Sequence, residues 1–187
     1  VLDDELQYVE GPECDAYHHA LGPGVLCYLT PFPGLTGAIL GGGDGILAAH
    51  LLRARPDVRL TVFELDPVVV RTFQTHPEAL AVNGDALAWV DRVVLGDALQ
   101  TLHGRYDAVF VDFPDRSLKT AYLYGDAMFA RVHGALLPGG VVSAYAGGAR
   151  APEAMERYFE RLGYQVVPGF EGGSALIVYG RRREGRP

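Results

Sequence analysis

Acidic residues recur in this sequence where apolar runs end, and their spacing could do chemistry. Asp44 stands within the glycine-rich stretch 41–45 (GGGDG), directly after the apolar run 38–40. A buried strand that leads through glycines into a helix lets a ligand approach bare backbone at the helix N-terminus. A carboxylate at that point would repel a phosphate and attract a cation. The stretch therefore predicts a binding site for an uncharged or cationic ligand.

Two further acids follow apolar runs downstream. Glu64 comes 19 residues after Gly45, the spacing at which an acid ending the second strand accepts hydrogen bonds from ribose hydroxyls. Asp97 opens an expected helix, so it is either a helix N-cap or an acceptor for the exocyclic amine of adenine, and the two roles are compatible. Together these acids predict a nucleoside site.

A pair of carboxylates follows the apolar run 108–111. Asp112 and Asp115 flank Phe113-Pro114. Two carboxylates three residues apart on a strand-to-loop turn can converge on one cation, hold its ammonium and accept its proton. The ordinary alternative is a turn-capping aspartate beside a surface aspartate.

The elements that must position these acids alternate along the chain. Strands are expected at 37–41, 59–64, 92–95, 106–112, 140–145, 164–168 and 174–179, and helices at 45–54, 67–75, 97–103, 122–137 and 151–162. This alternation indicates an α/β protein whose mainly parallel sheet is covered on both faces. The last two strands are so close in sequence that the second must return antiparallel. Ligands of such sheets bind at the carboxyl ends of the strands, where the acids stand.

These residues resemble the spermidine/spermine synthase family of polyamine aminopropyltransferases, and most of all bacterial members with the Asp-x-Pro-Asp form. The matching motifs are residues 41–45, Glu64-Leu65-Asp66, Gly96-Asp97, Asp112 to Asp115, and the upstream Asp15-Ala16-Tyr17-His18. The resemblance implies a Rossmann-like fold of the S-adenosylmethionine-dependent methyltransferase type, with a seven-stranded sheet and a C-terminal antiparallel hairpin. Residues 31–187 would form this catalytic domain, and residues 1–30 a hairpin and helical lead-in that remain from a β-domain.

By the same resemblance, the protein would transfer the aminopropyl group of decarboxylated S-adenosylmethionine to a di- or polyamine and release methylthioadenosine. Asp112 would be the catalytic base, and Tyr17 and Asp115 would bind the acceptor amine. The residues that bind the nucleoside co-substrate would be His18, Gly41, Gly42, Gly43, Asp44, Glu64, Asp97 and Ala98. A free alkyl amine has a pKa of about 10.4, so a protein group must remove its proton before it can attack. No prosthetic group and no metal are expected.

Two other functions stay open, a small-molecule methyltransferase that uses S-adenosylmethionine and a homologue that binds a nucleoside or polyamine without turnover. Asp44 would repel the carboxylate of ordinary S-adenosylmethionine, whereas the decarboxylated form presents only an ammonium, which favours aminopropyl transfer. Arg116 and His19 stand where the family usually has proline and glutamate. Whether the acceptor half of the site works, and which amine it takes, is open from the sequence.

Charge and composition limit the classes of molecule that the protein is expected to bind. A net charge of −7 without a basic stripe argues against nucleic-acid binding, and it suits either a cationic partner or solubility alone. Cys14 and Cys27 lack metal-ligand spacing and are expected to be structural thiols. No apolar run reaches the roughly 18 residues of a membrane span, which predicts a cytoplasmic location. The sequence begins at Val1 without methionine, so we expect that absent segments would carry any membrane attachment; a homodimer is compatible with the resemblance.

Other conspicuous residues have ordinary explanations. Trp89 is expected in the core. Four histidines without metal-ligand spacing are expected at the surface or at helix ends: His50, His76, His103 and His133.

Overall fold

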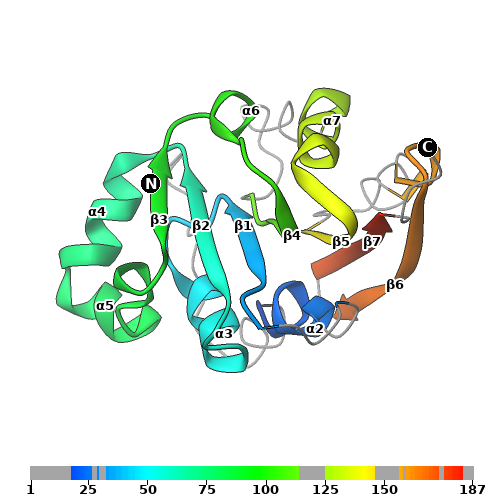
Figure 1. Ribbon diagram of the computed structural model, residues 1–187. Coiled ribbons are helices and arrows are strands. Elements are labelled where there is room, and N and C mark those ends of the chain that lie inside the picture. Colours follow the sequence, from blue (N-terminus) through cyan, green and yellow to red (C-terminus); the bar gives the residue numbers. More distant parts are fainter. Residues whose placement is uncertain are drawn as a thin grey trace.

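A seven-stranded sheet forms the centre of the molecule (Figure 1). The computed structural model describes residues 18–26, 29, 33–113, 125–145, 156–157, 159–172 and 175–182. The strands are β1 (Thr36–Leu40), β2 (Arg59–Glu64), β3 (Arg92–Leu95), β4 (Tyr106–Val111), β5 (Leu136–Tyr145), β6 (Tyr164–Gly172) and β7 (Ala175–Arg182). Their order in the sheet is β3-β2-β1-β4-β5-β7-β6. β1 to β5 pair in parallel and β7 runs antiparallel to both of its neighbours, which confirms the predicted fold class and the final hairpin.

Helices cover both faces of the sheet, and each face has its own apolar core. The helical segments are α2 (Pro23–Leu26), α3 (Ile46–Ala54), α4 (Pro67–Thr75), α5 (Pro77–Asn83), the 3-10 turn η1 (Ala86–Ala88), α6 (Ala98–Thr101) and α7 (Asp126–Ala135). α6 and α7 lie on one face, and α2 and α3 on the other (Figure 1). Because side chains alternate along a strand, Val109 of β4 joins the first core and Phe110 joins the second.

The strand register brings the carboxyl ends of β1, β2 and β4 to one edge. Leu40 pairs with Phe63 on one side and with Val111 on the other. The pairing continues one residue further, because the Gly41 amide donates to the Phe63 carbonyl at 2.8 Å and the Asp112 amide donates to the Leu40 carbonyl at 2.9 Å. The segments that follow these strands therefore start side by side, as the sequence predicted.

The boundary between α7 and β5 differs from the prediction. The sequence pattern predicted a helix over 122–137 and a strand at 140–145, but α7 ends at Ala135 and β5 begins at Leu136. β5 is irregular at this point, since Leu136 pairs with Tyr106 while Val141 pairs with Ala108. Gly139 has φ +78°, a conformation that suits glycine. Pro138 and the following glycines thus form part of a bulged strand, where sequence reasoning placed a helix end and a turn.

A helical excursion between β2 and β3 was not predicted. α5 and η1 occupy residues for which the sequence pattern indicated no element. Pro77 is the first residue of α5, where its missing N–H costs nothing, and Gly84 ends the helix with φ +60°. These are ordinary helix start and stop signals in a segment too short for its hydrophobic periodicity to be recognised.

The prediction that Trp89 lies in the core is wrong. Its side chain is 75% exposed, although Leu87, two residues earlier, is buried in the core beside α3. Trp89 follows η1 and leads into β3, which is the edge strand of the sheet. The indole therefore lies in the connection between η1 and the edge strand, where it is left to solvent.

The N-terminal hairpin predicted for residues 2–9 lies outside the described residues. Residues 18–21 are helical and α2 follows after Gly22. Leu21 and Val25 are fully buried in the same core as β1 and α3. Among the described residues, no helix combines the length and the hydropathy that crossing a bilayer requires.

Candidate functional site

The glycine loop after β1 is packed so tightly that side chains would not fit. A Cβ on Gly42 would lie 2.4 Å from Cγ2 of Ile39, and a Cβ on Gly43 would lie 2.4 Å from Cγ of Glu64. Gly41 has φ +92°, and its Cβ would lie 2.5 Å from the carbonyl oxygen of Asp112. Gly43 and Gly41 therefore let the loop touch the end of β2 and the residue after β4, and Gly42 lets it fold back on β1.

Asp44 sits at the entrance of α3 with its carboxylate among other acids. Its Oδ1 accepts a hydrogen bond from the Ile46 amide at 2.9 Å, which satisfies one free N–H of the first helical turn. Burial raises the pKa of Asp44 to about 6, and the negative charges of Asp112 and Glu64 contribute to the rise, against the Ile46 bond and the charge of His18. A cation bound here would relieve the repulsion. The fold therefore brings together Asp44 and Asp112, two acids that the sequence analysis predicted separately.

Glu64 ends β2 with its carboxylate buried against the loop. Its Oε2 accepts from the Gly43 amide at 3.0 Å and its Oε1 accepts from the Asp66 amide at 2.9 Å. Burial raises the pKa of Glu64, and these backbone donors oppose the rise. Each carboxylate oxygen can accept a further bond, so an oriented Glu64 can receive two neighbouring hydroxyls.

Asp97 caps α6, as one of its two predicted roles required. Its Oδ1 accepts from the Leu99 amide at 2.8 Å, and the following Ala98 is buried. Asp97 follows β3, which lies beside β2. Since the Gly96 amide donates to the Glu64 carbonyl at 2.8 Å, Asp97 begins its turn next to the end of β2, on the same edge as Glu64.

His18 is buried, and its ring contacts a residue of α3. The sequence did not predict this contact. Its ring stacks on His50 with the centroids 5.6 Å apart and the planes at 15°. His50 is half-buried in the middle of α3, so it is neither a fully exposed surface histidine nor a helix-end histidine, as the prediction had it. His50 comes one helical turn after Ile46, whose amide binds the Asp44 carboxylate.

The other three histidines and His19 differ in exposure. His133 is half-buried in the last turn of α7, which confirms the predicted helix-end position, and its Nδ1 is bonded to the hydroxyl of Tyr164 at 3.0 Å. His76 and His103 are exposed, as predicted. His19 is also exposed, directly beside the buried His18.

Part of the predicted acceptor side falls outside the described residues. Tyr17, Asp115 and Arg116 belong to that part, so their predicted roles stay predictions. Within the described part of the chain, no cluster of three or more His, Cys, Asp or Glu side chains could hold a metal ion.

Sequence reasoning missed one buried polar residue at this site. Asn83, at the end of α5, donates from Nδ2 to the Asp44 carbonyl at 2.9 Å. Its signal was the dipeptide Asn83-Gly84 after a proline-initiated helix, which is a typical helix end. Because α5 itself was not predicted, the side chain could not be assigned a direction.

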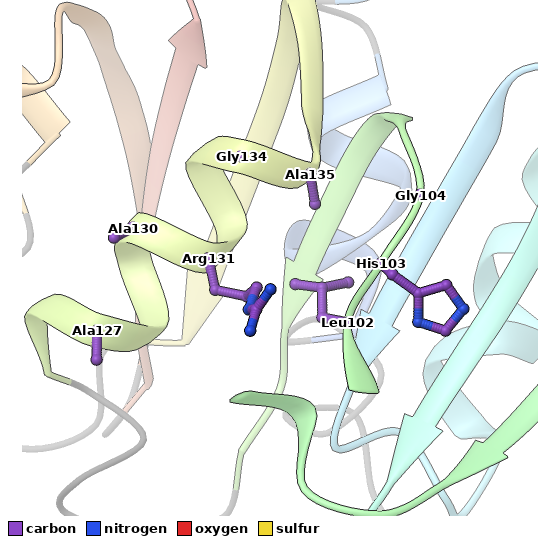
Figure 2. Close-up of a pocket in the computed structure, with 8 residues that line it drawn as sticks. All are labelled: Leu102, His103, Gly104, Ala127, Ala130, Arg131, Gly134 and Ala135. Carbon is purple, nitrogen blue, oxygen red and sulfur yellow. The ribbon is translucent and has the colours of Figure 1, made fainter. Parts of the chain in front are cut away.

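An open groove of about 490 Å³ lies elsewhere on the molecule, between α7 and the segment that connects α6 to β4. Figure 2 shows the side chain of Arg131 reaching from α7 toward Leu102, and its Nε donates to the Leu99 carbonyl at 2.9 Å. None of the strand-end acids lines this groove. It is therefore separate from the candidate site.

The sheet order, with β7 antiparallel among parallel strands, defines a Rossmann-like fold of the methyltransferase type. A solved spermidine synthase in complex with the transition-state analogue AdoDATO shares this fold, with a TM-score of 0.64 over 90% of this chain and 59% of that one, at 18% identity. The sequence profile of the spermine/spermidine synthase domain matches residues 25–172. The chain belongs to that family.

Curated relatives carry the names of enzymes of this family. A polyamine aminopropyltransferase of Corynebacterium efficiens is 37% identical over 126 residues, which are 58% of this chain and 23% of that protein. Polyamine aminopropyltransferase 2 of Streptomyces coelicolor is 33% identical over 158 residues, which are 78% of this chain and 26% of that protein. The chain thus spans about a quarter of the length of these relatives.

Proposed function

We propose that this protein is a polyamine aminopropyltransferase, which moves an aminopropyl group from decarboxylated S-adenosylmethionine to a di- or polyamine. The observation that carries the proposal is the closeness of Asp44 and Asp112 at the glycine loop, where their mutual repulsion helps to raise the pKa of Asp44. A site that gathers carboxylates in a buried place is suited to an ammonium. The names of its bacterial relatives and the AdoDATO complex of the spermidine synthase neighbour support the same chemistry.

The nucleoside would lie along the ends of β1 to β3. Glu64, held by two backbone amides, would accept the ribose hydroxyls, and the Asp97 carboxylate would accept the adenine amine. The bare backbone of Gly41 to Gly43 would let the ligand approach, and Ala98 would lie beside the adenine. His18, braced by His50, would close the nucleoside from the side of the N-terminal helix.

Asp44 would hold the ammonium of the aminopropyl group. Its carboxylate is already oriented by the Ile46 amide, so little side-chain entropy would be lost on binding. A bound ammonium favours the charged carboxylate and lowers its pKa. The carboxylate of ordinary S-adenosylmethionine would meet repulsion at the same place.

Asp112 would act as the base at the reacting amine. The amine nitrogen attacks the propyl carbon next to the sulfonium, the carbon–sulfur bond breaks, and the bond's electrons leave on sulfur as neutral methylthioadenosine. The proton released from the amine goes to Asp112, with Tyr17 and Asp115 proposed to hold the acceptor. The residues that bind both ligands would then accelerate the reaction mainly by aligning nitrogen, carbon and sulfur.

Two measurements on the 187-residue chain test the proposal. Calorimetry should show tighter binding of decarboxylated S-adenosylmethionine than of the ordinary form, and incubation with putrescine, cadaverine, spermidine or agmatine should release methylthioadenosine. Preference for the carboxylated form together with methyl transfer would identify a methyltransferase. Binding of nucleoside and amine without any product would identify a non-catalytic homologue.

A further inference from the structure

Asn83 is a buried polar residue that the proposed chemistry does not use. It is the one asparagine of the sequence, and its side chain is 1% exposed. A primary amide buried to this extent is costly unless both of its N–H groups and its oxygen are bonded. The partners of Asn83 therefore show what its burial achieves.

Both N–H groups and the oxygen of the amide bind backbone groups, one of which belongs to the glycine loop. Nδ2 donates to the Asp44 carbonyl at 2.9 Å and to the Phe73 carbonyl of α4 at 3.1 Å, and Oδ1 accepts from the Asp85 amide at 2.9 Å. One side chain thus ties together the loop, the end of α4 and the turn before η1. An amide can make this set of bonds because it offers two donors and one acceptor.

The bond from Asn83 gives the Asp44 carbonyl a hydrogen-bond donor, which α3 does not supply. Gly45 is the N-cap of α3, and the N-cap carbonyl accepts the first bond of a helix. The carbonyl of Asp44 precedes the N-cap, so the helix provides no donor for it. Gly45 also allows Asn83 to approach, because a Cβ there would lie 3.0 Å from Nδ2 of Asn83.

We propose that Asn83 is a positioning residue that fixes the backbone at Asp44 and so aims the Asp44 carboxylate at the ligand's ammonium. The carboxylate is oriented from two sides, by Asn83 through the Asp44 carbonyl and by the Ile46 amide through Oδ1. Asn83 thereby sets the preference for a nucleoside that carries an ammonium over one that lacks it. This role rests on the proposed function, in which Asp44 binds the aminopropyl group.

Calorimetry with Asn83→Asp tests the positioning role. The substitution keeps the shape and the acceptor for Asp85 but places an oxygen against two carbonyls. We expect the affinity for decarboxylated S-adenosylmethionine to fall at least about tenfold more than the affinity for methylthioadenosine, which has no ammonium. In an Asp44→Asn background, the same change should weaken both ligands equally. If Asn83→Asp does not fold, Asn83→Ser, which keeps a single donor, replaces it in the same calorimetric comparison.

Asp107→Asn is the matched control, because Asp107 also binds a segment distant in the sequence: its carboxylate accepts from the Thr36 amide at 2.9 Å and from the Thr36 hydroxyl at 2.8 Å. These bonds lie at the start of β1, at the opposite end of the sheet from the site. The control variant should lose stability without changing the ratio of the two affinities. Equal losses for both ligands in the Asn83 variants would overturn the positioning role.

Hydrogen exchange separates this inference from the proposed function. In the Asn83 variants without ligand, the Ile46 amide should exchange at least about tenfold faster, while the amides of β1 keep their protection. An unchanged Ile46 rate would overturn the inference even if the wild type transfers aminopropyl groups. A wild type that shows no preference for the ammonium ligand would instead overturn the proposed function, and the exchange result would still decide whether Asn83 fixes the loop.

Discussion

Asp44 is the residue whose environment says most about the ligand. Burial and neighbouring carboxylates raise its pKa to about 6 from 3.8, so the folded protein holds this proton more tightly than the unfolded chain does. Below about pH 4 the side chain is protonated in both states and has no effect on stability. As the pH rises from about 4 to about 6, the unfolded chain loses this proton before the folded protein does, so the free energy of unfolding falls. The full loss of stability is present at neutral pH. The ionised Asp44 carboxylate therefore lowers the stability of the fold, and a bound cation would offset this cost.

Replacement of Asp44 by asparagine should remove this cost. The asparagine side chain would keep an oxygen for the Ile46 amide and carry no charge, so Asp44→Asn should raise the free energy of unfolding at pH 8 by up to about 3 kcal/mol. At pH 4 the variant and the wild type should be nearly equal. Urea denaturation at the two pH values measures the difference. A variant that is less stable than the wild type at pH 8 would contradict the raised pKa.

Asp112 is the residue on which turnover should depend most. Asp112→Asn removes the proposed base and keeps the size of the side chain, so turnover should fall at least about 100-fold. The affinity for methylthioadenosine, measured by calorimetry, should change little, because the ligand has no group for Asp112 to deprotonate. Unchanged turnover would show that another residue accepts the proton.

At the scale of elements, the site depends on the close approach of the glycine loop to β2. A Cβ at Gly43 would lie 2.4 Å from Cγ and 2.6 Å from Oε2 of Glu64, so one of the two must move. Gly43→Ala should break the 3.0 Å bond between the Gly43 amide and Glu64 and weaken methylthioadenosine binding at least about tenfold. It should also cost about 1–3 kcal/mol of stability by overpacking.

Gly134→Ala provides the matched glycine substitution. Gly134 is exposed in α7, and a Cβ there would meet no atom within 4 Å. Alanine should therefore stabilise the helix by about 0.5–1 kcal/mol and leave methylthioadenosine binding unchanged. Denaturation and calorimetry on both variants would check the contrast. Tight binding by Gly43→Ala would show that the loop can shift without loss of the site.

At the scale of the whole molecule, one buried side-chain polar atom among the described residues has no hydrogen-bond partner. The Ser143 hydroxyl of β5 is buried, and no donor or acceptor in the described part of the structure meets it. A buried hydroxyl without a partner costs about 1–3 kcal/mol. Ser143→Ala should raise the free energy of unfolding by about 1 kcal/mol, measured by urea denaturation. A loss of stability would indicate that the hydroxyl bonds an internal water.

The fold could be predicted from the sequence because most of its elements carry a local signal. Apolar runs ended by glycine or an acidic residue located β1 to β4, and the short link before β7 required an antiparallel return. The segments from Pro77 to Ala88 and around Leu136 were missed or misplaced. A two-turn helix has too few residues to show a period, and a bulged strand that contains Pro138 and two glycines has the composition of a turn.

The sequence by itself determined which acids stand at the strand ends, because the position of a residue after an apolar run is a local property. Only the tertiary structure decided which groups the site residues contact. Asp44 lies near Asp112, Glu64 binds the Gly43 amide, His18 stacks on His50, and Asn83 binds the Asp44 carbonyl. These contacts join segments far apart in the chain or on elements with no clear signal. They depend on strand order and register, which bring β2 and β4 to either side of β1. The raised pKa of Asp44 follows from that arrangement, since burial and neighbouring charge exist only once the chain has folded.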